Sequence, residues 1–125
     1  MPHVPERSAE EAALVLLDLA RDHDFVLHEH FLTDLAGHRG TDSEREEAAQ
    51  RIEALVAALA VRAEEEQVLV IAVSDHGNLE DGSTRLHTMN PVPFLAWGPG
   101  AREAVEPATD LTHVAPAVLG ALGVQ

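Results

Sequence analysis

Six consecutive apolar residues, Val68 to Val73, constrain the fold of this chain more than any other feature. The run is rich in β-branched side chains and has no polar alternation, a pattern typical of a central strand buried on both faces. It stops at Ser74-Asp75-His76-Gly77, where polar side chains and a glycine indicate a loop. A strand buried on both faces needs helices to cover it, so the run predicts an α/β protein.

Helical and strand patterns lie on either side of this run. Ser8 to Glu11 form a capping box, and the apolar spacing that follows predicts a helix ending near Asp22. Residues 25–32 begin apolar and then alternate, which predicts a strand. The remaining predicted elements are a long amphipathic helix that begins at residues 41–43, a short strand over residues 91–97, and a last helix capped by Asp110 with Pro116 in its first turns.

This order of elements predicts one domain over residues 1–125, with an N-terminal helix in residues 1–24. We expect a three-layer α/β/α fold with a short, mostly parallel sheet. Because 46% of the residues are apolar but only one Trp, three Phe and no Tyr occur, the core must consist of Leu, Val and Ala.

The composition excludes several classes of function. A formal charge of -14 without a basic stripe opposes binding to nucleic acid or to anionic lipid. No apolar run reaches the ~18 residues of a membrane span. The polar, proline-containing start is not a signal peptide, and the absence of Cys excludes disulfides and thiolate ligands, so we expect a cytoplasmic protein.

Five side chains have the chemistry of metal ligands and follow the predicted strands. Asp34 and His38 are four residues apart, so on a helical turn both would face one way, with Gly37 permitting a backbone turn between them. Asp75 and His76 follow the central strand, and Gly77 supplies the bend that lets both reach one ion. Ligands gather beyond the carboxyl ends of strands in such sheets, so with His87 these groups predict a site for a divalent ion such as Mn²⁺ or Zn²⁺.

Three further residues are candidates for contact with the substrate or with a metal ligand. Arg85 can bind a phosphate, although an Arg in a loop with Asp81 nearby is more often a salt-bridge partner. Glu29 lies between two histidines that share the other face of the predicted strand at 25–32, and Asn78 follows the Asp75-His76 pair. Glu29 or one of these two histidines can orient a metal ligand, but a strand that faces a polar cleft is the favoured interpretation.

Four segments of the chain resemble the C-terminal part of the alkaline phosphatase superfamily. They are TDLAGH at 33–38, SDHGN at 74–78, HTMNPVPFLAWG at 87–98 and DLTHVAPAVLGALG at 110–123. The resemblance points to the metalloenzyme branch that includes cofactor-independent phosphoglycerate mutase and phosphopentomutase, and it covers residues 25–125. It implies a partial alkaline phosphatase-like fold and a metal-dependent enzyme that transfers phosphoryl groups of small phosphate esters.

The resemblance also implies a role for each candidate ligand. Asp34, His38 and His87 would share one metal, and Asp75 and His76 would serve a second. The branch takes its last metal Asp and its nucleophilic Ser or Thr from a segment near the N-terminus of a longer protein. No matching segment occurs in these 125 residues, so the nucleophile stays unknown and Ser74 and Thr33 are expected only to hydrogen-bond within their loops.

Three interpretations of the whole chain are open. In the first, the chain is a C-terminal fragment or half of a phosphohydrolase-like metalloenzyme, and an exposed strand edge seeks the missing N-terminal half or a second copy of the chain. In the second, it is a non-catalytic metal-binding or protein-interaction module. In the third, it is a compact α/β domain that binds no metal.

Overall fold

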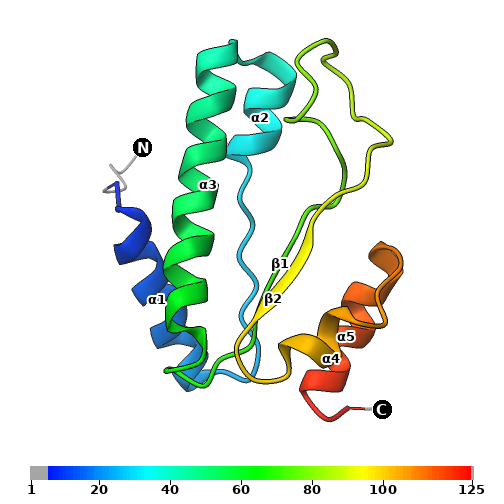
Figure 1. The fold of residues 1–125 in the computed structure, drawn as a ribbon. Helices are drawn as coiled ribbons and strands as arrows, with labels where there is room; N and C mark the ends of the chain where they lie inside the picture. Colours follow the sequence, from blue (N-terminus) through cyan, green and yellow to red (C-terminus); the bar gives the residue numbers. More distant parts are fainter. Residues whose placement is uncertain (1–5, 125) are drawn as a thin grey trace.

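The computed structural model describes residues 6–124 (Figure 1). Helices account for most of the ordered elements, and two short strands pair with each other. The elements are α1 (Ala9–Asp22), α2 (Leu32–Arg39), α3 (Asp42–Ala63), β1 (Val70–Val73), β2 (Phe94–Trp97), α4 (Ala101–Val105), the 3₁₀ helix η1 (Leu111–His113) and α5 (Val114–Ala121). An α/β protein is confirmed.

Both long helices begin at capping boxes. In α1, the Ser8 hydroxyl accepts a hydrogen bond from the Glu11 N–H, and the Glu11 carboxylate accepts one from the Ser8 N–H at 2.8 Å. Thr41 and Glu44 form the same pair of bonds at the start of α3. These bonds satisfy N–H groups that no helical carbonyl can reach. The predicted start of each helix is confirmed, and α1 ends at Asp22 as expected; the part of the N-terminal prediction that falls on residues 1–5 lies outside the described residues.

The core lies mainly between α1 and α3, which pack side by side (Figure 1). Ala13 and Leu17 of α1 are at most 1% exposed, and Leu55 and Ala63 of α3 are buried. All buried apolar side chains in residues 6–124 are alanines or leucines. Valines were expected in the core as well, but those of β1 are only half-buried or exposed because helices cover the strand pair incompletely.

The strand predicted over residues 25–32 is wrong. Residues 25–30 are extended but belong to no ladder, and Leu32 already begins α2. The segment runs along the length of α3 between the ends of α1 and α2 (Figure 1). A strand needs a hydrogen-bonded neighbour, and within the described part of the chain none lies beside it. Its apolar side chains remain exposed to solvent, since Phe25 is 54% exposed and Leu27 is 74% exposed.

The two strands form an antiparallel pair, so the mostly parallel sheet is also wrong for residues 6–124. Val70 stands opposite Trp97, and Val73 stands opposite Phe94. The connection from β1 to β2 contains no helix, and a parallel pair would need such a crossover. Both strands were predicted, and each is shorter than its apolar segment. Helices contact the pair through α3 and α4, but a complete three-layer arrangement stays a prediction.

The C-terminal part of the structure agrees more closely with the predictions from the sequence. Asp110 caps η1, accepting a hydrogen bond from the Thr112 N–H at 2.9 Å, and α5 continues directly from η1. Pro116 is the third residue of α5, where its missing N–H costs little. The short helix α4, between β2 and η1, was not predicted. None of the helices in the described residues is both long enough and apolar enough to cross a membrane.

Candidate metal centre

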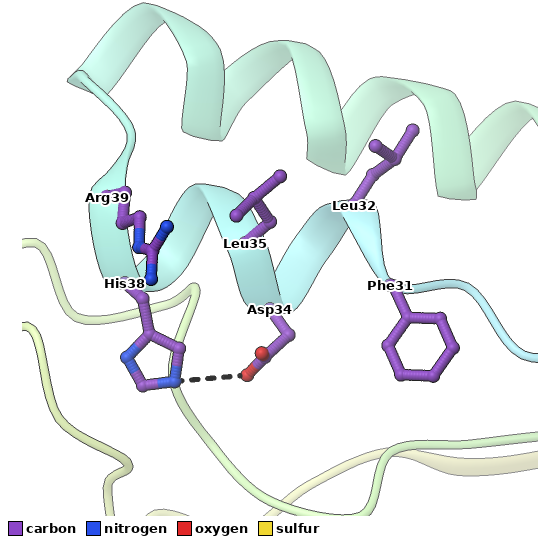
Figure 2. A pocket seen from close by; sticks show the side chains of 6 residues that line it. All are labelled: Phe31, Leu32, Asp34, Leu35, His38 and Arg39. Atoms are coloured by element: carbon purple, nitrogen blue, oxygen red, sulfur yellow. Dashed lines mark ion pairs between the residues drawn. The ribbon is translucent and has the colours of Figure 1, made fainter. Parts of the chain in front are cut away.

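Helix α2 places Asp34 and His38 on one face. Side chains four residues apart on a helix lie one turn apart on the same side. The Nε2 atom of His38 is 3.3 Å from Oδ1 of Asp34, and Figure 2 shows the two groups pointing toward each other. The helical spacing predicted for this pair is therefore present.

Gly37 lets the loop after β1 press against α2. A β carbon at residue 37 would stand 1.3 Å from Oδ1 of Asn78, so only a residue without one permits this contact. Gly37 lies inside α2, and its interpretation as a turn residue is wrong. Asn78 is 4% exposed, and its amide nitrogen is 3.4–3.5 Å from both ring nitrogens of His38. Asn78 thus packs against the His38 ring.

A long loop between the two strands carries the other imidazoles. Gly77 and Thr88 form an isolated antiparallel bridge, in which the Thr88 N–H donates to the Gly77 carbonyl at 2.9 Å. The bridge brings together two histidines that are eleven residues apart in the sequence. The rings of His76 and His87 stack with centroids 3.5 Å apart and planes inclined by 17°.

Glu80 fastens this loop and was missed by the sequence analysis. Its carboxylate accepts hydrogen bonds from the Thr88 hydroxyl, from the Asn90 amide at 3.0 Å and from the Asn78 N–H at 2.7 Å. These bonds, led by that of Thr88, lower the pKa of Glu80 to about 2. An acidic residue soon after a glycine bend was the only local signal, and its partners lie up to ten residues away.

Two arginines join the loop to the helices around it. The Arg45 side chain, 7% exposed on α3, donates to the carbonyl of Leu79. Arg85 donates from its guanidinium to the carbonyl of Gly40 at 2.8 Å, just beyond α2. The Arg85 side chain is therefore engaged with the main chain, whereas it was expected to contact phosphate or Asp81.

The result is a convergence of three imidazoles on one carboxylate oxygen. The Nε2 atoms of His38, His87 and His76 lie 3.3, 3.6 and 3.8 Å from Oδ1 of Asp34. The Nε2 atoms of His38 and His87 are 3.0 Å apart. Asp34, His38 and His87 together offer three ligand atoms that all lie within 4.8 Å of one another.

The protonation of His38 suits a metal ligand. Its Nδ1 lies 2.7 Å from the main-chain oxygen of Arg85, and a carbonyl oxygen can only accept a hydrogen bond. Nδ1 therefore carries the proton, and in the neutral ring Nε2 has a lone pair and lies 3.3 Å from Oδ1 of Asp34 and 3.0 Å from Nε2 of His87. Metal-ligating histidines are commonly held by such a bond from the opposite ring nitrogen.

The cluster fits a divalent cation. Oδ1 of Asp34 is buried and has no hydrogen-bond donor within the described residues, a costly state for a carboxylate oxygen. Ligand atoms around a tetrahedral ion with bonds of about 2.0–2.1 Å stand about 3.3 Å apart. The three separations observed among Asp34, His38 and His87 are 3.0, 3.3 and 3.6 Å. A cation between these atoms would satisfy the buried oxygen and both imidazole lone pairs.

Asp75 and His76 lie at the edge of this cluster. Oδ2 of Asp75 is 3.4 Å from Nε2 of His76, and the Asp75 side chain is 85% exposed. His76 thus stands between Asp75 and Asp34. The arrangement leaves room for a second ion held by Asp75 and His76, which stays a prediction.

The other candidates do not join the cluster. Glu29 is exposed in the extended segment before α2, and it forms no hydrogen bond or ion pair with the cluster in the described residues. The Ser74 hydroxyl donates to the His76 carbonyl at 2.8 Å, and the Thr33 hydroxyl donates to the His30 carbonyl at 3.2 Å. Both hydroxyls therefore hydrogen-bond within their own segments, as expected.

An α/β domain that gathers a carboxylate and three imidazoles in this way is a domain of the metalloenzyme class. Comparison with protein families agrees: residues 3–125 match the Metalloenzyme superfamily. The chain belongs to this family, and the resemblance noted in the sequence is confirmed.

Two curated relatives of this chain carry the same name. The 2,3-bisphosphoglycerate-independent phosphoglycerate mutase of Parabacteroides distasonis is 33% identical over 129 residues, which cover 97% of this chain and 25% of that protein. The protein of the same name from Halobacterium salinarum is 31% identical over 96% of this chain and 25% of its own length. The chain therefore spans about a quarter of the length of these relatives. No solved structure matches it.

Proposed function

We propose that this chain is the metal-binding part of a phosphoryl-transfer enzyme that acts on small phosphate esters. The observation that carries the proposal is the buried, unbonded Oδ1 of Asp34 with three imidazole nitrogens within 3.8 Å. A carboxylate and imidazoles in this arrangement suit Mn²⁺ or Zn²⁺. Membership of the Metalloenzyme superfamily and the mutase names of the relatives supply the reaction class.

Each residue of the cluster has a distinct task in this proposal. Asp34, His38 and His87 hold the first ion, and the carbonyl of Arg85 keeps His38 in the tautomer that can bind it. His76 and Asp75 hold a second ion. A bound divalent ion polarises phosphoryl oxygens and offsets their charge. This offset of charge matters here, because a protein with a formal charge of -14 otherwise repels a phosphate ester.

The nucleophile comes from outside the described site. Ser74 and Thr33, the hydroxyls near the cluster, each donate to a main-chain carbonyl of their own segment. The relatives are about four times as long as the matched region, so we propose that a complementing N-terminal half supplies the missing groups. Large exposed apolar side chains beside the cluster, such as Phe31 at 69% and Leu35 at 53%, suit such a partner.

Hydrolysis of an aryl phosphate tests this function. The chain is loaded with Mn²⁺ or Zn²⁺ and measured alone and after mixing with the remaining three quarters of the Parabacteroides distasonis mutase, produced separately. We expect the mixture to hydrolyse the ester faster than free metal does, and the Asp34→Asn chain to abolish that gain. A rate equal to that of free metal in every combination contradicts the proposal.

A non-catalytic interaction module is the second candidate, and one observation favours it. Apolar side chains are exposed on elements well away from the cluster, including Leu14 and Leu19 on α1 and Leu119 on α5. In that case a homo-oligomer would cover them, and the metal would serve stability only. Size measurement in solution together with the ester assay separates the candidates, because an interaction module should form a homo-oligomer and should show no ester hydrolysis with or without Mn²⁺.

A further inference from the structure

We infer that Arg39 binds an oxygen of the phosphoryl group beside the metal centre, and so provides the cationic contact for the substrate. The inference rests on the proposed function and names a substrate-binding residue for it. It differs from the sequence interpretation, in which Arg85 was the candidate for contact with phosphate.

Arg39 lines a cavity that also contains metal-centre residues. The cavity has a volume of about 570 Å³ and lies along one side of α2 (Figure 2). Asp34 and His38 form part of its wall, and Arg39 lies at the same end of the helix as His38. A group held by an ion at Asp34 and His38 would therefore enter the space that Arg39 borders.

Arg39 differs from most other basic residues in the partners of its guanidinium group. All eight basic residues of the chain are arginines, against 22 acidic residues. Three of them pair with carboxylates and two donate to main-chain carbonyls. These five are Arg21, Arg51, Arg102, Arg45 and Arg85.

Arg39, Arg7 and Arg62 have no such partner within residues 6–124, and of these only Arg39 lines the cavity at the metal centre. In so acidic a chain, an arginine without a carboxylate partner is available for an external anion. Asp34 borders the same cavity, yet its contacts below 4 Å are to imidazoles and not to this guanidinium.

The contacts of Arg85 and Arg39 explain why Arg39, and not Arg85, is assigned to the phosphoryl group. The Arg85 guanidinium donates to the Gly40 carbonyl, and the Arg85 carbonyl accepts a hydrogen bond from Nδ1 of His38. The side chain and the main chain of Arg85 are therefore both used in building the site. The Arg39 guanidinium makes no hydrogen bond to any other described residue, and its planar fork of N–H donors matches two oxygens of a phosphate. The ligand class is accordingly a phosphate monoester whose dianionic group lies between the metal centre and Arg39.

Binding of inorganic phosphate and of phenyl phosphate to the Mn²⁺-loaded chain tests the inference. Affinity for Mn²⁺ is measured first by calorimetry for each variant, and the two anions are then titrated at saturating Mn²⁺. We expect Arg39→Gln to weaken both anions about tenfold or more without changing the affinity for Mn²⁺. Arg39→Lys should lose less, because it keeps the charge but not the fork.

Arg62→Gln is the matched control. Arg62 also has no partner in the described residues and carries the same charge, but it lies near the far end of α3, about 30 Å along the helix from Thr41. It should leave anion affinity within about twofold of the original, which separates a local contact from a change in net charge.

Three outcomes overturn the inference. Unchanged anion affinity in Arg39→Gln, with Mn²⁺ binding intact, refutes it and leaves the proposed function standing. Absence of phosphate binding to the Mn²⁺-loaded original chain also refutes it. A chain that binds no Mn²⁺ refutes both proposals together.

Discussion

Oδ1 of Asn78 occupies the space that a β carbon on residue 37 would need, 1.3 Å from the ideal position of that carbon on Gly37. The contact joins two elements that each carry part of the metal centre. Asp34 and His38 belong to α2, whereas His76 and His87 belong to the loop between the strands. The position of one pair relative to the other thus depends on the absence of a single side chain.

Replacing Gly37 by Ala should therefore destabilise the protein. Ala is favoured over Gly inside a helix by about 1 kcal/mol, but overpacking against buried Asn78 costs about 1–3 kcal/mol. We expect a net loss in the free energy of unfolding by urea and a weaker affinity for Mn²⁺, because the loop must move away from α2. Gly120→Ala in α5 is the control, since no atom lies within 4 Å of its added β carbon and propensity alone should act. Equal stability changes in both variants contradict the account.

Glu80 should make the stability of the folded protein depend on pH in the acidic range. Its hydrogen bonds, that of Thr88 foremost, lower the pKa of its carboxyl from 4.5 to about 2. Because the pKa in the folded state lies below that in the unfolded state, the stabilisation is complete above the unfolded value. It is lost as the pH falls toward 2.

Urea unfolding of metal-free protein between about pH 6 and pH 3 measures this effect. The Glu80→Gln variant should be less stable at the upper pH and should lose less stability than the original chain on acidification. Glu53→Gln, on the exposed face of α3, serves as control and should follow the original chain. Parallel curves for all three proteins would show that Glu80 does not fasten the loop.

His30 should also make the folded protein less stable as the pH falls, but in a higher pH range than Glu80. Burial, followed by the nearby charge of His28, lowers the pKa of His30 below its usual 6.5, and its buried Nε2 has no partner within residues 6–124. The folded protein takes up this proton less readily than the unfolded chain. Stability is therefore lost as the pH falls below about 6.5.

Replacing His30 by Leu should reduce that loss. The difference in unfolding free energy of metal-free protein between about pH 7.5 and pH 5.5 is the relevant quantity, because the substitution removes the part of that difference that arises from the lower pKa of His30 in the folded than in the unfolded state. His23→Leu, at the exposed C-cap of α1, is the matched control. If removing His30 leaves the acid-induced loss unchanged, the burial of its ring does not oppose protonation.

Much of the site could be predicted from local spacing. The four-residue separation of Asp34 and His38 needs only one helical turn, and the structure supplies it in α2. The pairing of His76 with His87 depends on a bridge between Gly77 and Thr88, and the glycine after His76 marks where the chain bends. Such features depend on a few neighbouring residues, so the sequence contains most of the information.

The predictions that failed depend on distant partners. Residues 25–30 have the alternation of a strand, but pattern alone cannot supply the neighbouring strand that completes a ladder. The direction of the β1–β2 pair depends on how the loop returns, which apolar runs do not encode. Glu80 and Arg45 look like ordinary surface charges in the sequence. Their roles appear only once Thr88 and Leu79 are brought to them by the fold.

The central claim is that Asp34, His38 and His87 bind a divalent cation, and calorimetric titration with Mn²⁺ and with Zn²⁺ tests it most directly. We predict saturable binding to the original chain and a loss of about 100-fold or more in affinity for Asp34→Asn, which keeps the shape of the side chain but removes its charge. Asp22→Asn at the end of α1 should bind as the original chain does. Equal affinity of the Asp34→Asn and original chains, or no binding of either ion by the original chain, would contradict the account.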